Sequence, residues 1–232
     1  MSIRKIWTKI QRMWTKFRLQ PIHVYCFHHV SVVFDADSMN RGDWVQIDEF
    51  KSKMLALQRD GVEFISLTDA YRRICNDCIR CKKYAVLTFD DGYASLKEIL
   101  PWLEEQLIPA TLFINGKYLD GKSYRKDPKE KYLTQNEILA ITSPLIEIGS
   151  HGWEHTDASQ MNEFEFVEYM DRNIRLLSSH PRYVSFHAYT WGKHTSVTDN
   201  ILLDRTLIPV LMDGIVNYNE LHVIHRELLK IK

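Results

Sequence analysis

Two adjacent carboxylates, Asp90 and Asp91, directly follow an apolar segment and precede a glycine. The segment at 84–89 (YAVLTF) carries no charge, which is typical of a strand buried on both faces in a parallel sheet. Asp91 and Gly92 predict a turn at its end, the position where α/β folds place their chemistry. Because neighbouring side chains of an extended segment point to opposite sides, one aspartate could bind a cation while the other handles a proton.

Two histidines four residues apart form a second candidate group. His151 and His155 follow a predicted strand at 145–149. Their spacing predicts that both imidazoles lie on one side of a helical turn, where they could hold a single cation. With Asp91 they would supply two nitrogens and one oxygen and leave positions open for water and substrate. This composition is typical of a catalytic rather than a structural metal site.

Predicted strands and helices alternate along the chain and would place these groups at strand ends of one sheet. The predicted strands are 22–27, 62–67, 84–89, 109–114, 145–149, 183–189, 207–212 and 222–228, and the main predicted helices are 47–59, 68–74, 96–107, 163–178 and 196–204. This α/β pattern predicts a closed or nearly closed (β/α) barrel of seven or eight repeats. An open doubly wound sheet is the alternative, although no glycine-rich nucleotide-binding fingerprint supports it.

The composition is that of one ordinary globular domain. Lysine and arginine balance aspartate and glutamate at 30 each, so no global field favours nucleic acid. We expect a cytoplasmic location, because no apolar run reaches the length of a membrane span and the N-terminus lacks the apolar centre of a signal peptide. Cys75, Cys78 and Cys81 could supply three thiolates but lack a fourth ligand, so reduced loop cysteines are expected.

Residues 1–20 differ in character from the single domain expected at 21–232. Apolar and aromatic residues recur at helical spacing between six basic residues, and no acidic residue is present. The pattern predicts a basic amphipathic helix, which could attach peripherally to the anionic inner face of the cell membrane. Packing of the same helix against the domain or a partner is the alternative.

The two chemical motifs resemble those of a known family. The segments 88–93 (TFDDGY) and 150–155 (SHGWEH) are similar to motifs of the NodB-homology polysaccharide deacetylases (carbohydrate esterase family 4), in the branch with an N-terminal Tyr-His-like motif. The resemblance covers about residues 22–228. It implies a distorted (β/α)7–8 barrel, with Asp90 as general base and one divalent metal, usually zinc, held by Asp91, His151 and His155. It also implies that His28 protonates the leaving amine.

The third family motif is altered in this chain. The family donates a backbone N–H to the oxyanion from an aromatic-Pro-Tyr-Gly segment, which Tyr189-Thr190-Trp191-Gly192 matches here. A backbone donor tolerates another side chain, so Trp191 is expected to serve, whereas Thr190 in place of proline loosens the turn. Ala188 stands where many members hold the base with an arginine.

Together these features predict a metal-dependent deacetylase. The expected substrate is an N-acetylated sugar in a polysaccharide, oligosaccharide or lipid-linked precursor at the cytoplasmic membrane face. A deformylase or O-deacetylase is an alternative, because the same site would hydrolyse either bond. A catalytically weak sugar-binding or scaffold member is another, given Thr190 and Ala188. Candidates for stacking on a sugar ring are Trp44, Trp153, Tyr189 and Trp191.

Overall fold

The computed structural model describes residues 20–32, 44–76, 82–120, 131–218, 222–229 and 231. The expected N-terminal helix lies outside the described residues, as do Cys78 and Cys81. Among the helices of the described part, none has both the length and the apolar character needed to cross a bilayer.

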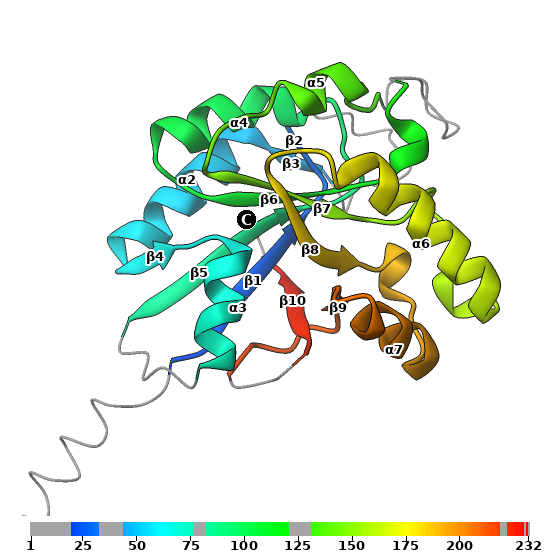
Figure 1. Ribbon diagram of the computed structural model, residues 1–232. Helices are drawn as coiled ribbons and strands as arrows, with labels where there is room; N and C mark the ends of the chain where they lie inside the picture. The colour runs from blue at the N-terminus through cyan, green and yellow to red at the C-terminus, as the bar shows by residue number, and fades with distance from the viewer. Residues whose placement is uncertain are drawn as a thin grey trace, which may run out of the picture.

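In the described ranges, seven parallel strands close into a ring (Figure 1), which confirms the expected distorted (β/α) barrel. The ring runs in the order β1 (Ile22–Phe27), β10 (Ile224–Leu228), β9 (Ile208–Met212), β8 (Tyr183–Ala188), β7 (Ile146–Ser150), β6 (Ala110–Ile114) and β5 (Lys83–Phe89), and β5 pairs with β1. Strand β4 (Val62–Phe64) stays outside the ring. It pairs with the first half of β5, and β6 pairs with the second half of the same edge.

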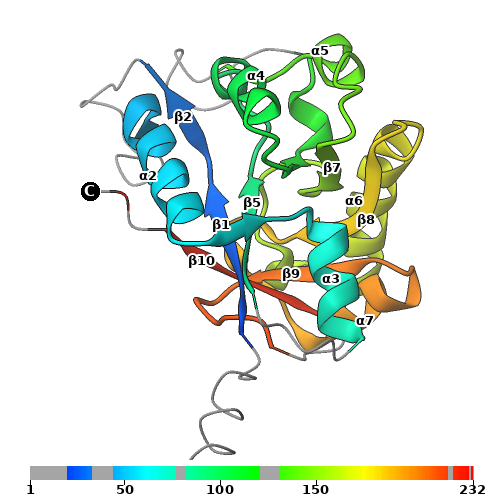
Figure 2. The same cartoon turned by 90° about the vertical axis from the view of Figure 1, so that its left-hand side faces the viewer.

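Helices surround the barrel (Figures 1 and 2), and the helix at Leu67–Cys75 packs its buried residues against the cluster inside the ring. The helices are α2 (Ile47–Arg59), α3 (Leu67–Cys75), α4 (Leu96–Glu105), α5 (Gln135–Leu139), α6 (Glu163–Leu177) and α7 (Ser196–Asp204), with short 3-10 helices η1 (Gly116–Tyr118), η2 (Ala158–Gln160) and η3 (Thr190–Gly192). A small parallel pair, β2 (His29–Ser31) and β3 (Trp44–Gln46), lies beside α4. Thr134 and Glu137 form a capping box at the start of α5.

The two-residue period of strand β5 separates two hydrophobic clusters. Leu87 and Phe89 face outward and pack in the cluster formed with α2, α4 and α5. Val86 belongs to the inner cluster, which also contains apolar residues of α3. Since alternate side chains share a face, Thr88 and Asp90 follow Val86 on the inner side. Continuing the strand by one residue therefore brings a carboxylate to the mouth of the barrel.

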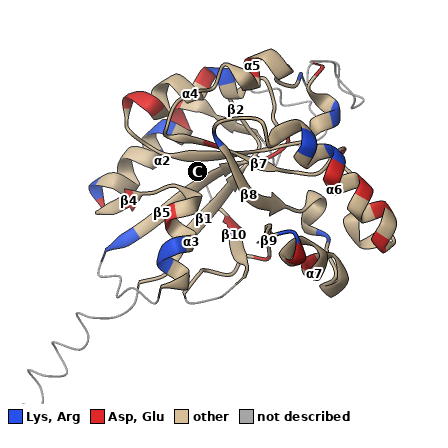
Figure 3. Cartoon of the chain, in the orientation of Figure 1, with Lys and Arg blue, Asp and Glu red and all other residues tan. Residues whose placement is uncertain are grey.

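Charged residues lie mainly on the outer helices and loops, and most strand positions carry other residues (Figure 3). Glu147 of β7 is an exception, because its side chain is buried. Its Oε2 accepts hydrogen bonds from the N–H groups of Leu67 and Thr68, at 3.1 and 3.4 Å, and from the Thr111 hydroxyl at 3.0 Å. The carboxylate thus satisfies the N-terminus of α3 and ties that helix to β7, the strand that leads to His151.

We predict that Glu147→Ala lowers the free energy of unfolding by about 3 kcal/mol, because it leaves three buried donors without their acceptor. Urea denaturation at neutral pH measures the change. Glu147→Gln retains an acceptor and should lose less. If the alanine variant were as stable as the parent chain, this carboxylate would not hold α3 in place.

Candidate active site

Asp90 and Asp91 leave the end of β5 and face the same pocket. The expectation that they point to opposite sides is wrong, because Asp91 is not extended: its φ is 69°, in the left-handed region. Gly92 continues the turn with a φ of 78°, and a Cβ at this position would lie 2.9 Å from the Cδ1 of Ile114. Glycine adopts this left-handed backbone without strain, whereas a larger residue would also have to displace the end of the Ile114 side chain.

His151 and His155 occupy an irregular loop after β7, so the expected helical turn is also wrong. Contacts from other elements shape this loop instead. The Asn115 side chain donates to the carbonyl of His151 at 2.6 Å. Gly152 has a φ of 79°, and a Cβ there would lie 2.0 Å from the hydroxyl oxygen of Tyr169. Long-range packing, rather than helical periodicity, brings the two imidazoles together.

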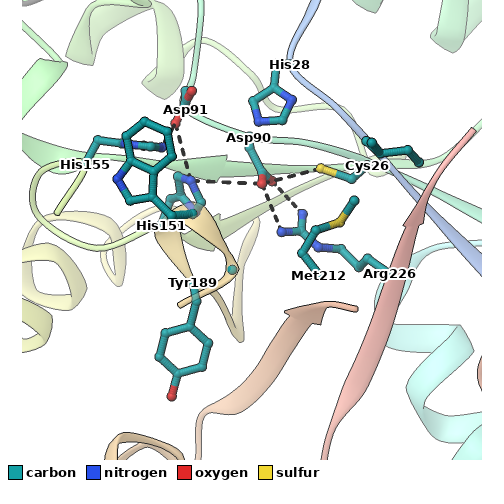
Figure 4. Close-up of a pocket in the computed structure, with 12 residues that line it drawn as sticks. Cys26, His28, Asp90, Asp91, His151, His155, Tyr189, Met212 and Arg226 are labelled. Atoms are coloured by element: carbon teal, nitrogen blue, oxygen red, sulfur yellow. Dashed lines mark hydrogen bonds and ion pairs between the residues drawn. The ribbon is translucent and has the colours of Figure 1, made fainter. Parts of the chain in front are cut away.

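Both imidazoles point their Nε2 atoms at one carboxylate oxygen (Figure 4). The Nδ1 of His151 lies 2.8 Å from the carbonyl oxygen of Ala188 and must donate to it, because a carbonyl only accepts. Its Nε2 is then directed at the Oδ1 of Asp91, 3.3 Å away, and the Nε2 of His155 is also 3.3 Å from that oxygen. Three donor atoms from β5 and the β7 loop thus converge on one point.

The spacing of these donors fits a tetrahedral divalent cation. Two ligand atoms about 2.0–2.1 Å from one zinc ion are separated by about 3.3 Å, whereas a charge-assisted N–H···O bond is shorter, about 2.7–2.9 Å. Burial opposes ionisation of Asp91, but His151 and His155 outweigh it and hold the pKa of this carboxyl well below its usual range. Asp91, His151 and His155 are therefore the residues that could hold a metal.

Arg226 of β10 holds Asp90, and the sequence analysis missed it. Its guanidinium donates to both carboxylate oxygens, at 2.6 and 2.9 Å (Figure 4). It also donates to the Thr88 hydroxyl, at 3.2 Å. Burial opposes ionisation of Asp90, but Arg226 is the strongest opposing influence and the pKa falls to about 2. The missing arginine at Ala188 is thus replaced from another strand. A signal existed in the alternation of Ile224 and Arg226, which share the inner face.

His28 and Cys26 complete this side of the pocket. His28 follows β1, lines the pocket and turns its ring toward Asp90 (Figure 4). Cys26 is buried, as expected for a strand residue, but it is more than a core side chain. Its Sγ lies 3.5 Å from the Oδ2 of Asp90, where the thiol donates a weak hydrogen bond.

Of the four aromatic residues expected to stack on a sugar, Trp191 is the one exposed at this pocket. Trp191 is 65% exposed. Its ring contacts the His155 ring edge-on, with the two ring centroids 4.4 Å apart. Tyr189 lines the pocket, but its buried ring points away from the carboxylates (Figure 4). Trp44 and Trp153 pack in other parts of the structure. Trp191 also has a left-handed backbone, with a φ of 58°.

The pocket has a volume of about 220 Å³. Sites that enclose a whole small-molecule ligand are larger, about 300–1,000 Å³. This pocket therefore suits one part of a ligand, with the rest of the ligand outside. It is lined by Cys26, His28, Asp90, Asp91, His151, His155, Tyr189, Trp191, Gly192, Met212, Arg226 and Leu228.

Comparison with known proteins identifies the family. The sequence profile described as polysaccharide deacetylase matches residues 79–204, and the chain belongs to this family. YxkH of Bacillus subtilis strain 168, whose name assigns it to the polysaccharide deacetylases, is 26% identical over 110 residues. That match covers 47% of this chain and 37% of YxkH.

Solved structures share the fold. IcaB from Ammonifex degensii superimposes with a TM-score of 0.75 at 21% identity, covering 91% of this chain and 92% of IcaB. The Streptococcus pyogenes deacetylase PplD, solved in complex with acetate, gives a TM-score of 0.78 at 20% identity and covers 90% of this chain and 92% of PplD. At these identities the likeness establishes the barrel and its topology.

We predict that Arg226→Gln raises the pKa of Asp90. Burial raises this pKa, and the substitution removes the positive charge that lowers it. A depressed carboxyl pKa stabilises the fold above the unfolded value of about 3.9 and loses that contribution as the pH falls through about 2. The variant should lack this contribution at pH 7. Its free energy of unfolding should be about 3–5 kcal/mol lower, as expected when a buried ion pair is broken.

The control is Arg205→Gln, which removes the partly exposed ion pair with Asp171 at 3.4 Å. This change should cost less than about 1 kcal/mol. Urea denaturation of both variants at pH 7 and pH 4 makes the comparison. Equal losses at pH 7 would contradict the role given to Arg226.

Proposed function

We propose that this chain is a metal-dependent deacetylase that hydrolyses the N-acetyl group of an N-acetylated sugar in a polysaccharide, oligosaccharide or lipid-linked precursor. One observation carries the proposal. Three metal-binding donors, Asp91, His151 and His155, share a pocket with Asp90, a carboxylate that Arg226 keeps ionised. A cation site next to a carboxylate that can accept a proton is an arrangement that catalyses the attack of water on an amide.

Each residue of the pocket has a role in the proposed reaction. A divalent cation bound by the three donors would polarise the acetyl carbonyl and lower the pKa of the attacking water. Asp90 accepts the proton of that water, and Arg226 orients its carboxylate. His28 donates a proton to the leaving amine from the other side of Asp90. The backbone N–H of Trp191 stabilises the negative charge that develops on the carbonyl oxygen.

The shape of the site supports a sugar substrate. The pocket has room for the acetamido group, and the exposed Trp191 at its rim offers a flat face to the pyranose ring outside. The lipid-linked form of the substrate, at the inner face of the membrane, is a part of the proposal that rests on the basic amphipathic pattern of residues 1–20. A formamido or O-acetyl group would fit the same pocket, so deformylation and O-deacetylation remain the alternative reactions.

A catalytically weak sugar-binding member was suggested by the altered third motif. Ala188 removes the usual arginine, but Arg226 approaches Asp90 from β10 and supplies two hydrogen bonds to it. Thr190 replaces the usual proline, yet its hydroxyl donates to the carbonyl of Thr156 and ties the turn to the histidine loop. Both contacts favour catalysis over binding alone.

We predict that the purified chain binds one divalent cation and that His155→Ala lowers the affinity by orders of magnitude, because one of three protein ligands is lost. Metal content after dialysis, measured by mass spectrometry, reports the change. His194→Ala is the control, since His194 pairs with Asp199 rather than with the donor cluster. Full metal content in a His151→Ala/His155→Ala double variant would refute the site.

We predict that Asp90→Asn retains the cation, because no ligand is lost. Its rate of acetate release from N-acetylated chitooligosaccharides should fall by about 10²–10⁴-fold, because a proton acceptor is removed. Glu105→Gln removes an exposed carboxylate of α4 and should leave the rate unchanged. If Asp90→Asn lost its metal instead, the roles of Asp90 and Asp91 would be exchanged.

A further inference from the structure

A second set of metal-binding atoms lies beside the first. Cys26, His28 and Asp90 each offer one ligand atom, and the three atoms lie within 4.8 Å of one another. None of these residues belongs to the set of Asp91, His151 and His155. The Cys26 thiol and the His28 ring both point at the carboxylate of Asp90 (Figure 4). One sulfur, one nitrogen and one oxygen thus meet at the pocket wall.

The measured spacing suits a tetrahedral ion here as well. Bonds of about 2.3 Å to sulfur and about 2.0 Å to oxygen place the two ligand atoms about 3.5 Å apart in a tetrahedral zinc site. The Sγ of Cys26 lies 3.5 Å from the Oδ2 of Asp90. The same oxygen is 4.0 Å from the Nε2 of His151, so the two sites would be neighbours.

The surrounding charge makes this second site the weaker one. Arg226 donates to both oxygens of Asp90 and repels a cation placed next to it. Each carboxylate oxygen has two lone pairs, however, so the contact with Arg226 leaves an acceptor position on Oδ2. The Cys26 side chain is buried, and a metal that binds there must displace the thiol proton. Sulfur is a soft ligand, which favours thiophilic ions such as zinc and disfavours magnesium or calcium.

We infer that Cys26, His28 and Asp90 form a second, weaker zinc site whose occupation inhibits the enzyme. When zinc binds, a sulfur–zinc bond forms and the thiol proton leaves to solvent. Asp90 and His28 then serve as ligands and can no longer accept or donate the protons of hydrolysis. Binding to this site follows from the geometry of the three residues. The inhibition rests, in addition, on the proposed deacetylase function.

Cobalt titration of the full chain tests the binding. The Cys75→Ser/Cys78→Ser/Cys81→Ser background leaves Cys26 as the sole thiol among the four cysteines of the sequence. After removal of bound metal, the first equivalent of cobalt should add no thiolate-to-cobalt charge-transfer absorption, because the first site has no sulfur. Further cobalt should produce the band in the near ultraviolet.

Cys26→Ala in the same background should bind the first equivalent and never develop the band. Circular dichroism checks that the alanine variant is folded. If it is not, Cys26→Val, whose larger side chain fills more of the buried volume, is used in its place. The inference is overturned if the band accompanies the first equivalent, persists without Cys26, or fails to form at millimolar cobalt.

Acetate release measured against zinc concentration tests the inhibition. In the background chain, the rate of acetate release at saturating zinc should be about 10²-fold or more lower than the rate at one equivalent of zinc. This is the loss expected when a general base is removed. In Cys26→Ala, the ratio of the two rates should stay near one. A charge-transfer band without this fall would refute inhibition. A band in a chain that never releases acetate would support the site and refute the proposed function.

Discussion

The buried ion pair between Asp90 and Arg226 is the interaction on which the site depends. Both side chains are almost completely buried, at 3% and 1% exposure, and the desolvation of two charges can exceed their mutual attraction. A pair of apolar residues could fill this space with equal or better stability. Retention of the charges therefore points to a use for the carboxylate. In the function proposed above, that use is to accept a proton beside the three residues that could hold a cation.

This ion pair in turn requires the barrel to close. Asp90 follows β5 and Arg226 lies in β10, on either side of β1 in the ring. The two residues are 136 positions apart in the chain. Only the pairing of β1 with both neighbours brings the inner faces of β5 and β10 together. Strand β6, which pairs with both β5 and β7, places the β7 loop, and with it His151, against the end of β5.

Backbone conformations at the barrel mouth then divide the two carboxylates between separate tasks. The left-handed turn at Asp91 directs its oxygen to His151 and His155, and Asp90 continues the strand toward Arg226. A left-handed backbone costs free energy at a residue other than glycine, and such positions concentrate at functional sites. Trp191, whose ring contacts that of His155, has the same conformation.

The amino-acid sequence alone determined the barrel class and the positions of four chemical residues. Alternation of strand and helix patterns, the uncharged segment before Asp90 and Asp91, and the spacing of His151 and His155 are local features, and short-range backbone preferences and burial set them. The tertiary structure decided the rest. It made Arg226 the partner of Asp90, turned Asp91 away from the strand, and aligned the two imidazoles without a helix. These outcomes depend on barrel closure and on packing between distant segments. The free energy of such contacts comes from residues far apart in the chain, so local sequence patterns do not predict it.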